Sequence, residues 1–218
     1  MSVIRGPILF GAAIATTADG VWVGGGDVYR RGRPDKAGVR FVFKIDPRQN
    51  AVAQRTRLRS TTVIDLLGDG RSLWATGWGG VVKLAASGRV VFQQRFYGSG
   101  WAIALAPGAV WVAQPFSGTR DPRTQRVIHR LLRVRTRPRR LTVIEWNTGR
   151  PGLGPGDVSA AAGVVWVGAN YGLARVDAAQ EAPALTTVPV DVVPNRIEAF
   201  AGGAWVDQVN SAKLLKIC

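Results

Sequence analysis

A short tryptophan motif that recurs five times constrains the fold of this chain more than any other feature. In each copy a small or apolar residue is followed by an apolar residue, a tryptophan and another apolar or small residue. The five copies are Gly20–Val23, Ser72–Ala75, Ala109–Val112, Val164–Val167 and Gly203–Val206. Successive motif tryptophans lie 37 to 55 residues apart. A spacing of this size indicates a repeated supersecondary unit.

Segments with apolar residues at every second position flank each motif and predict β-strands. One such strand precedes the motif across a Gly, Pro or Asp turn, and a third strand follows it. A fourth strand follows in four of the copies, at 51–58, 90–97, 140–146 and 184–190. Four short strands in each of five units predict an all-β fold, specifically a five-bladed β-propeller with four-stranded antiparallel blades. The motif tryptophans are predicted to pack between neighbouring blades.

The first residues of the chain offer a strand for the fifth unit, which lacks a fourth one. Residues 1–8 are β-like and precede the first complete unit. We expect them to close the ring, because an added strand removes an open sheet edge. The predicted single domain, 1–218, then has blades at about 9–58, 59–97, 98–146, 147–190, and 191–218 together with 1–8.

Two alternatives concern the ends of the chain. Residues 1–18 weakly resemble a secretory signal, with one arginine before an apolar patch. We expect a cytoplasmic protein if this segment is a closing strand and an exported one if it is a signal. A chain that stops after a third strand is also what a fragment of a longer propeller protein would show.

The charge of the chain is strongly positive and unevenly distributed. The formal net charge is +15, and all of the excess comes from residues 1–150. Such an asymmetry predicts a localised basic surface that attracts an anionic ligand or an acidic protein. A GC-rich coding sequence would also produce the excess of arginine over lysine. The single cysteine, Cys218, excludes an intrachain disulfide, and no apolar run is long enough for a transmembrane helix.

The basic residues concentrate in two long connections between the second and third strands of a unit. These connections, 24–40 and 115–130, are expected on the same face, because both join equivalent strands. Arginine binds phosphate and carboxylate groups with two parallel hydrogen bonds. The predicted ligand-binding residues are Arg30, Arg31, Arg33, Arg40, Arg120, Arg123, Arg126 and Arg130. Few aromatic residues accompany them in the loops, which does not favour sequence-specific recognition of nucleic acid.

Four acidic residues on predicted inner strands or their exits are candidates for a site in the central channel. They are Asp65, Asp157, Glu198 and Asp207, with Arg196 as an electrostatic partner. Carboxylates that meet at a channel could hold Ca²⁺ or Mg²⁺ or act as acid and base. No other cofactor is predicted. The sole histidine, His129, is predicted in the arginine-rich loop and has no nucleophile beside it in the sequence.

Two stretches resemble a known family of repeats. Residues 187–206 and 156–170, the latter followed by Leu-Ala-Arg-Val-Asp at 173–177, are similar to bacterial YVTN-type and streptogramin-lyase-like propeller repeats. The resemblance implies the propeller scaffold. Its lyase branch implies a histidine base, a supporting glutamate and a divalent metal, whereas this chain has its only histidine outside the predicted inner strands.

The sequence therefore predicts a monomeric, non-catalytic propeller that binds an anionic ligand or acidic partner through a basic face. A lyase-like or metal-assisted enzyme with a site at the channel mouth is the first alternative. Convergence of two or more of the four acids would favour the enzyme, and a continuous arginine surface would favour binding.

Overall fold

The computed structural model describes residues 11–25, 29–30, 33–34, 40–59, 61–114, 129–146, 156–169, 172–190, 193–208 and 213–218. Their regular structure consists of β-strands paired in antiparallel fashion, and these residues contain no helix. The all-β prediction is therefore confirmed. The chain divides into two compact units, Met1–Gly100 and Trp101–Cys218.

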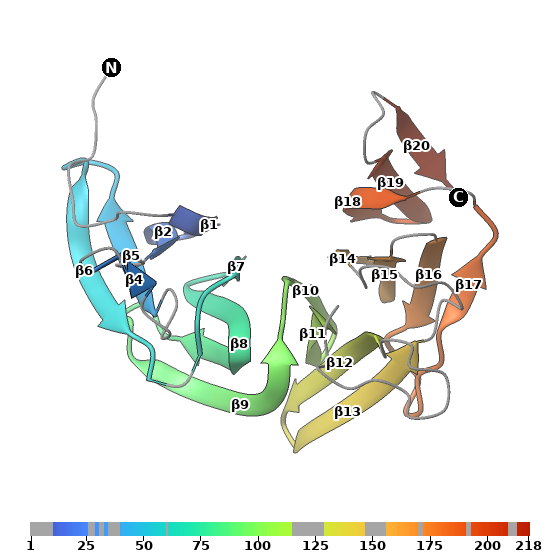
Figure 1. The fold of residues 1–218 in the computed structure, drawn as a ribbon, viewed down its shortest axis with the longest axis horizontal. Helices are drawn as coiled ribbons and strands as arrows, with labels where there is room; N and C mark the ends of the chain where they lie inside the picture. The colour runs from blue at the N-terminus through green and yellow to red at the C-terminus, as the bar shows by residue number, and fades with distance from the viewer. Residues whose placement is uncertain are drawn as a thin grey trace. The chain divides into compact units, whose positions relative to one another are not determined.

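The first unit contains a four-stranded sheet and a three-stranded sheet, each in chain order (Figure 1). The four-stranded sheet has the order β1-β2-β5-β6, and the three-stranded sheet has the order β7-β8-β9. A two-stranded ribbon, β3-β4, lies within the predicted insertion at 24–40. The strands are β1 Gly11–Thr17, β2 Gly20–Gly25, β3 Tyr29–Arg30, β4 Arg33–Pro34, β5 Phe41–Asp46, β6 Ala51–Arg57, β7 Asp65–Asp69, β8 Ser72–Leu84 and β9 Val90–Ser99.

The second unit contains two four-stranded sheets and one three-stranded sheet, again in chain order. The strands are β10 Ala102–Ala106, β11 Ala109–Gln114, β12 His129–Thr136, β13 Arg139–Trp146, β14 Asp157–Ala161, β15 Val164–Ala169, β16 Gly172–Asp177, β17 Thr186–Val188, β18 Pro194–Phe200, β19 Gly203–Gln208 and β20 Leu214–Ile217. The described part of the chain thus holds five meander sheets of three or four strands, which fits a five-bladed propeller. The predicted closing strand, 1–8, lies outside the described residues.

The second sheet departs from the predicted pattern, because its second and third strands are one element, β8. The first part of β8 pairs with β7, and the part from Trp78 onward pairs with β9. The ammonium group of Lys83 nevertheless lies 5.1 Å from the ring centre of Trp74. Nine residues of extended strand would span about 30 Å, so β8 must turn back on itself. Gly79, with a φ of +89°, allows this tight turn directly after Trp78.

Four of the five motif tryptophans are buried, as predicted, and three of them pack between consecutive sheets. Trp22 belongs to a core cluster with Leu66 and Leu73 of the next sheet. Trp111 packs with Val158 and its neighbours, and Trp166 packs with residues of β18 and β19. Trp205 of the last sheet differs, because 39% of its surface is exposed.

A basic residue stands directly opposite most motif tryptophans on the third strand. The register pairs are Trp22 with Lys44, Trp111 with Arg133, Trp166 with Arg175, and Trp205 with Lys216. In several sheets the cation lies over the indole ring, a favourable cation–π arrangement. Lysine and arginine are thus part of the repeat, although their charge suggests a surface role.

The indole N–H of Trp111 is buried without a hydrogen-bond partner. Trp22 donates its indole N–H to Thr17 Oγ1 at 3.0 Å, and Trp74 donates to Asp69 Oδ2 at 3.2 Å. Both acceptors lie five residues before their tryptophan, and the residue at this position before Trp111 is Ala106. Alanine has no acceptor, which explains the unsatisfied group.

We expect Ala106→Thr to stabilise the protein by about 1 kcal/mol, because the hydroxyl supplies the missing acceptor. The measurement is the midpoint of urea unfolding. Ala106→Val is the matched control, since valine has the shape of threonine and no hydroxyl. Equal midpoints for the two variants would show that the hydrogen bond does not form.

Candidate functional site

One edge of the first two sheets is rich in arginine. We call it the insertion edge, because it is the edge where the second strand of a sheet passes to the third and where the 24–40 insertion begins. Arg40 precedes β5, Arg57 ends β6, Arg59 follows it, and Arg95 pairs with Gly80 close to the turn of β8. The side chains of Arg57, Arg59 and Arg95 are exposed.

Carboxylates are segregated to the opposite edge of these two sheets. Asp19 and Asp69 lie at the turns between first and second strands, and Asp46 lies at the turn between β5 and β6. Asp65 is the one acidic residue at the insertion edge among the described residues of this unit. Its Oδ1 accepts the N–H of Leu66 at 2.8 Å. The insertion edge is therefore strongly cationic.

The structure describes two of the eight predicted ligand-binding arginines with their side chains. Arg40 donates from Nη1 to the carbonyl of Arg59 at 3.5 Å, which places both residues together at the insertion edge. Arg130 is in β12 and donates to Glu145 of β13, at 3.0 Å from Nη2. The backbones of Arg30 and Arg33 pair in the β3-β4 ribbon. The remaining four, Arg31, Arg120, Arg123 and Arg126, lie outside the described residues.

The placement of His129 in a loop was wrong. His129 is the first residue of β12, pairs with Trp146 and is 2% exposed. The reason is that β12 begins at His129 itself, two residues before the buried Leu131, so that the two side chains share a face of the strand. It is not a solvent-exposed member of the arginine-rich loop.

Two of the four predicted channel acids, Asp157 and Glu198, are close enough to interact. Partial burial raises the pKa of Asp157, and Glu198 raises it further, while two backbone N–H donors and Arg196 act in the opposite direction. Those donors are the N–H of Val158, 2.9 Å from Oδ1, and the N–H of Ile197, 2.6 Å from Oδ2. Both carboxylate oxygens of Asp157 therefore accept hydrogen bonds from backbone N–H groups. The bond from Ile197 links β14 to β18 of the next sheet.

The other two acids have different surroundings. Asp207 accepts the side-chain amide of Asn195 at 2.9 Å. Asp65 belongs to the first unit, whereas the other three belong to the second. Among the described residues, no three histidine, cysteine, aspartate or glutamate side chains form a group that could hold a metal ion. The prediction of Ca²⁺ or Mg²⁺ as a ligand stays a prediction.

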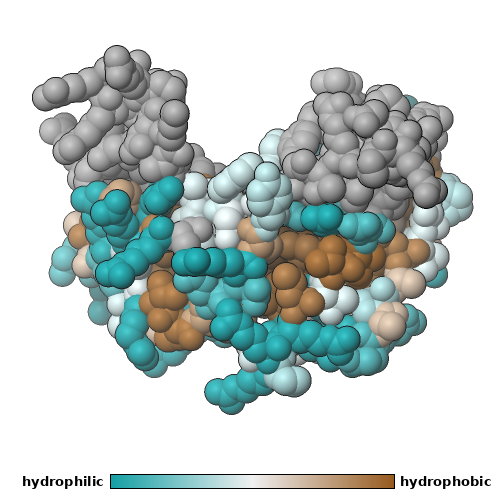
Figure 2. Space-filling model, turned by 60° about the horizontal axis from the view of Figure 1, so that its bottom comes forward, coloured by the Kyte–Doolittle hydropathy of each residue, from teal (hydrophilic) through white to brown (hydrophobic). Residues whose placement is uncertain are grey.

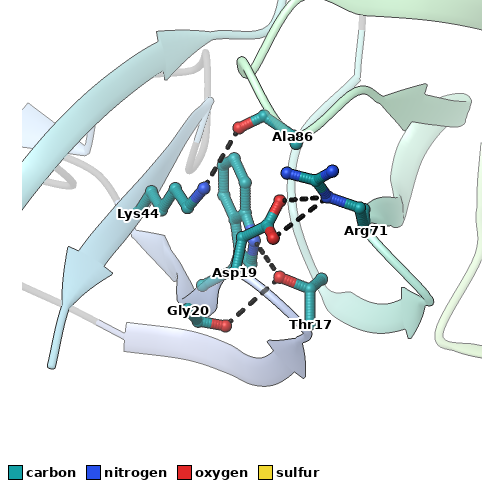
Figure 3. A network of polar contacts seen from close by, with 7 residues as sticks. Thr17, Asp19, Gly20, Lys44, Arg71 and Ala86 are labelled. Atoms are coloured by element: carbon teal, nitrogen blue, oxygen red, sulfur yellow. Dashed lines mark hydrogen bonds and ion pairs between the residues drawn. The ribbon is translucent and has the colours of Figure 1, made fainter.

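A polar hollow of about 600 Å³ lies at the opposite edge of the first sheet, lined by residues of 18–20, 44–48 and 53–54. Figure 3 shows the contacts beside it, which join the first sheet to the second. Asp19 accepts Arg71 Nε with both oxygens, at 3.0 and 3.1 Å. Lys44 lies over Trp22 and donates to the carbonyl of Ala86 at 3.2 Å. Asp19 and Lys44, two of the charged residues that line the hollow, thus have structural partners.

Sequence reasoning missed two exposed aromatic residues at the insertion edge. Trp78, at the turn of β8, is 56% exposed, and Tyr97 of β9 is 70% exposed. On the face drawn in Figure 2, apolar residues reach the surface between hydrophilic ones. A signal was present, because Trp78 does not fit the recurring motif and is surrounded by glycines at 77, 79 and 80.

Comparison with solved structures supports the fold. The chain is similar to the WD40 domain of Neurospora crassa Pan2, with 12% identity, a TM-score of 0.64, and coverage of 93% of this chain and 61% of that chain. It is also similar to a chain in the crystal structure of the mitotic checkpoint complex, with 11% identity, a TM-score of 0.66, and coverage of 94% and 60%. At such identities the likeness concerns the fold alone.

These findings place the chain among proteins with a β-propeller-type fold. It spans about 60% of the length of each of these two chains. No protein-family model matches the chain, and no curated protein does. Within the described residues, nothing forms a helix that is long and apolar enough to span a membrane.

Proposed function

We propose that this chain is a non-catalytic propeller-type binding module that binds an anionic ligand or an acidic partner through the insertion edge. The segregation of charge in the first two sheets carries the proposal. Arg40, Arg57, Arg59 and Arg95 lie at this edge, and Asp65 is the one described carboxylate there. A cluster of one sign attracts the opposite charge and speeds its association.

Several features of the chain fit this role. Arginine keeps its charge under all physiological conditions and binds carboxylate and phosphate groups in a bidentate manner. Arg30, Arg31 and Arg33 of the 24–40 insertion precede Arg40 in the sequence and add to the basic character of this segment. The YVTN-type and streptogramin-lyase-like repeats that the sequence resembles include binding proteins. The enzyme and the longer-propeller alternatives stay predictions, as does the monomeric state.

Reversal of charge at the insertion edge should weaken binding to a polyanion. We expect the double variant Arg57→Glu and Arg59→Glu to elute from a heparin column at lower salt than the native chain. The slope of log affinity against log salt should fall by about 2, because two phosphate-type contacts are lost. The measurements are elution salt and binding of soluble heparin at several salt concentrations.

The control for this experiment changes the same two sheets at their opposite edge. Arg48 lies in the turn after β5, and Arg89 precedes β9. Changing both to glutamate lowers the net charge by the same four units. If this control loses as much affinity as the first variant, net charge alone governs binding and no particular edge is used. Absence of heparin binding by the native chain would refute the proposed function.

A further inference from the structure

The insertion edge combines exposed aromatic rings with arginines. Trp78 pairs with Ser99, and Arg95 pairs with Gly80. Tyr97 lies between these two register pairs on β9, so it is close to the turn that carries Trp78. On β9 the residues Arg95 and Tyr97 are two apart and both exposed. The register is irregular between the two pairs, and the exposure of both side chains places a guanidinium group and a phenol ring at the surface of this edge.

The surroundings of Trp78 differ from those of the buried tryptophans. Four of the five motif tryptophans, Trp22, Trp74, Trp111 and Trp166, are buried and serve as packing, whereas Trp78 lies outside the motif. Trp78 is instead held by its backbone, whose N–H donates to Thr62 Oγ1 at 2.7 Å. The neighbouring glycines have no side chains to cover the indole. The ring is therefore presented to solvent on a fixed turn.

We propose that the insertion edge binds single-stranded nucleic acid without sequence preference, by stacking bases on Trp78 and Tyr97 while the arginines contact phosphates. This inference rests on the proposed function and names the class of its ligand. An acidic protein segment satisfies the arginines but offers no flat rings in regular succession. A single strand supplies both a phosphate chain and unstacked bases, and each base has a π face for stacking. A duplex hides its bases, so it can use only the arginines.

The test compares a ligand that has bases with one that has only charge. The probes are a fluorescent oligothymidylate of about 15 nucleotides, a length that spans several stacked bases, and heparin. We expect the double variant Trp78→Ala and Tyr97→Ala to lose about tenfold or more in affinity for the oligothymidylate, since a stacked base contributes substantially to binding. Heparin elution should stay at the native salt concentration, because the arginines are unchanged.

Two further variants serve as controls. The double variant Trp78→Phe and Tyr97→Phe keeps the aromatic rings and should bind oligothymidylate nearly as well as the native chain. Trp205→Ala removes an exposed tryptophan from the second unit and should have no effect on either ligand. Circular dichroism of each variant verifies the fold. A duplex of the same length should bind more weakly than the single strand.

The outcomes separate the two proposals. If the native chain binds heparin but not oligothymidylate, or if removal of both rings leaves oligothymidylate affinity unchanged, the nucleic-acid inference is wrong and the anion-binding function stands. Binding of an acidic peptide in preference to oligothymidylate also overturns the inference. If neither heparin nor oligothymidylate binds, both proposals fail.

Discussion

Replacing Gly68 with alanine is expected to destabilise the protein by about 3 kcal/mol, the upper part of the range for an overpacked interior position. Gly68 lies in β7, where a Cβ atom would come within 1.9 Å of the carbonyl oxygen of Thr16 in β1. The clash is with backbone, so no side-chain rotation can relieve it. The first strands of the two sheets would have to separate. The loss should appear as a lower midpoint of urea unfolding.

The matched control for this substitution is Gly172→Ala in β16. Gly172 is likewise a strand glycine and is buried, but a Cβ atom there meets no atom within 4 Å. Alanine restricts the unfolded chain more than glycine does, so this variant should be neutral or slightly more stable. Similar losses in both variants would mean that the inner strands are not packed as closely as the structure shows.

The arrangement of strands could be predicted because each unit carries strong local signals. A β-branched or apolar residue on either side of the motif tryptophan, and glycine at the adjacent turn, specify a strand and its end. Residues at alternate positions then define which face is buried. These signals are local and repeated, so an error in one copy does not affect the others. The sequence predicts separate second and third strands in this unit, and the structure joins them through the glycine-rich turn at 77–80 as one element, β8.

The functional surface could be predicted only in part. Arginine content identified a basic face, but the partner of a charged side chain depends on register between strands. Arg130 looked free in the sequence, yet it faces Glu145 across the β12-β13 pair. Asp157 looked like a channel carboxylate, yet both its oxygens accept backbone N–H groups. Exposure of Trp78 likewise follows from the position of the turn in β8, which composition does not reveal.

Arg133 shows most clearly how a charged residue can belong to the interior. It is 3% exposed, and its guanidinium group lies 5.4 Å from the ring centre of Trp111. Nη2 donates to the carbonyl of Ala178 at 2.6 Å, and Nη1 donates to the carbonyl of Gln180 at 2.5 Å. These carbonyls belong to the turn after β16 in the next sheet. Lys44 makes the equivalent contact with Ala86 in the first unit.

We therefore expect Arg133→Ala to lower the free energy of unfolding by about 3 kcal/mol, because two charge-assisted hydrogen bonds and the packing against Trp111 are lost together. Arg175→Ala is the control at the equivalent position of the next sheet, where the side chain is exposed, and it should change stability by less than about 0.5 kcal/mol. Urea unfolding of both variants provides the measurement. Arg133→Lys should recover only part of the loss, since one ammonium group cannot reproduce the planar fork that reaches both carbonyls. If Arg133→Ala were as stable as Arg175→Ala, Arg133 would not connect the two sheets. The Trp–cation pairs would then contribute nothing measurable to the stability of the fold.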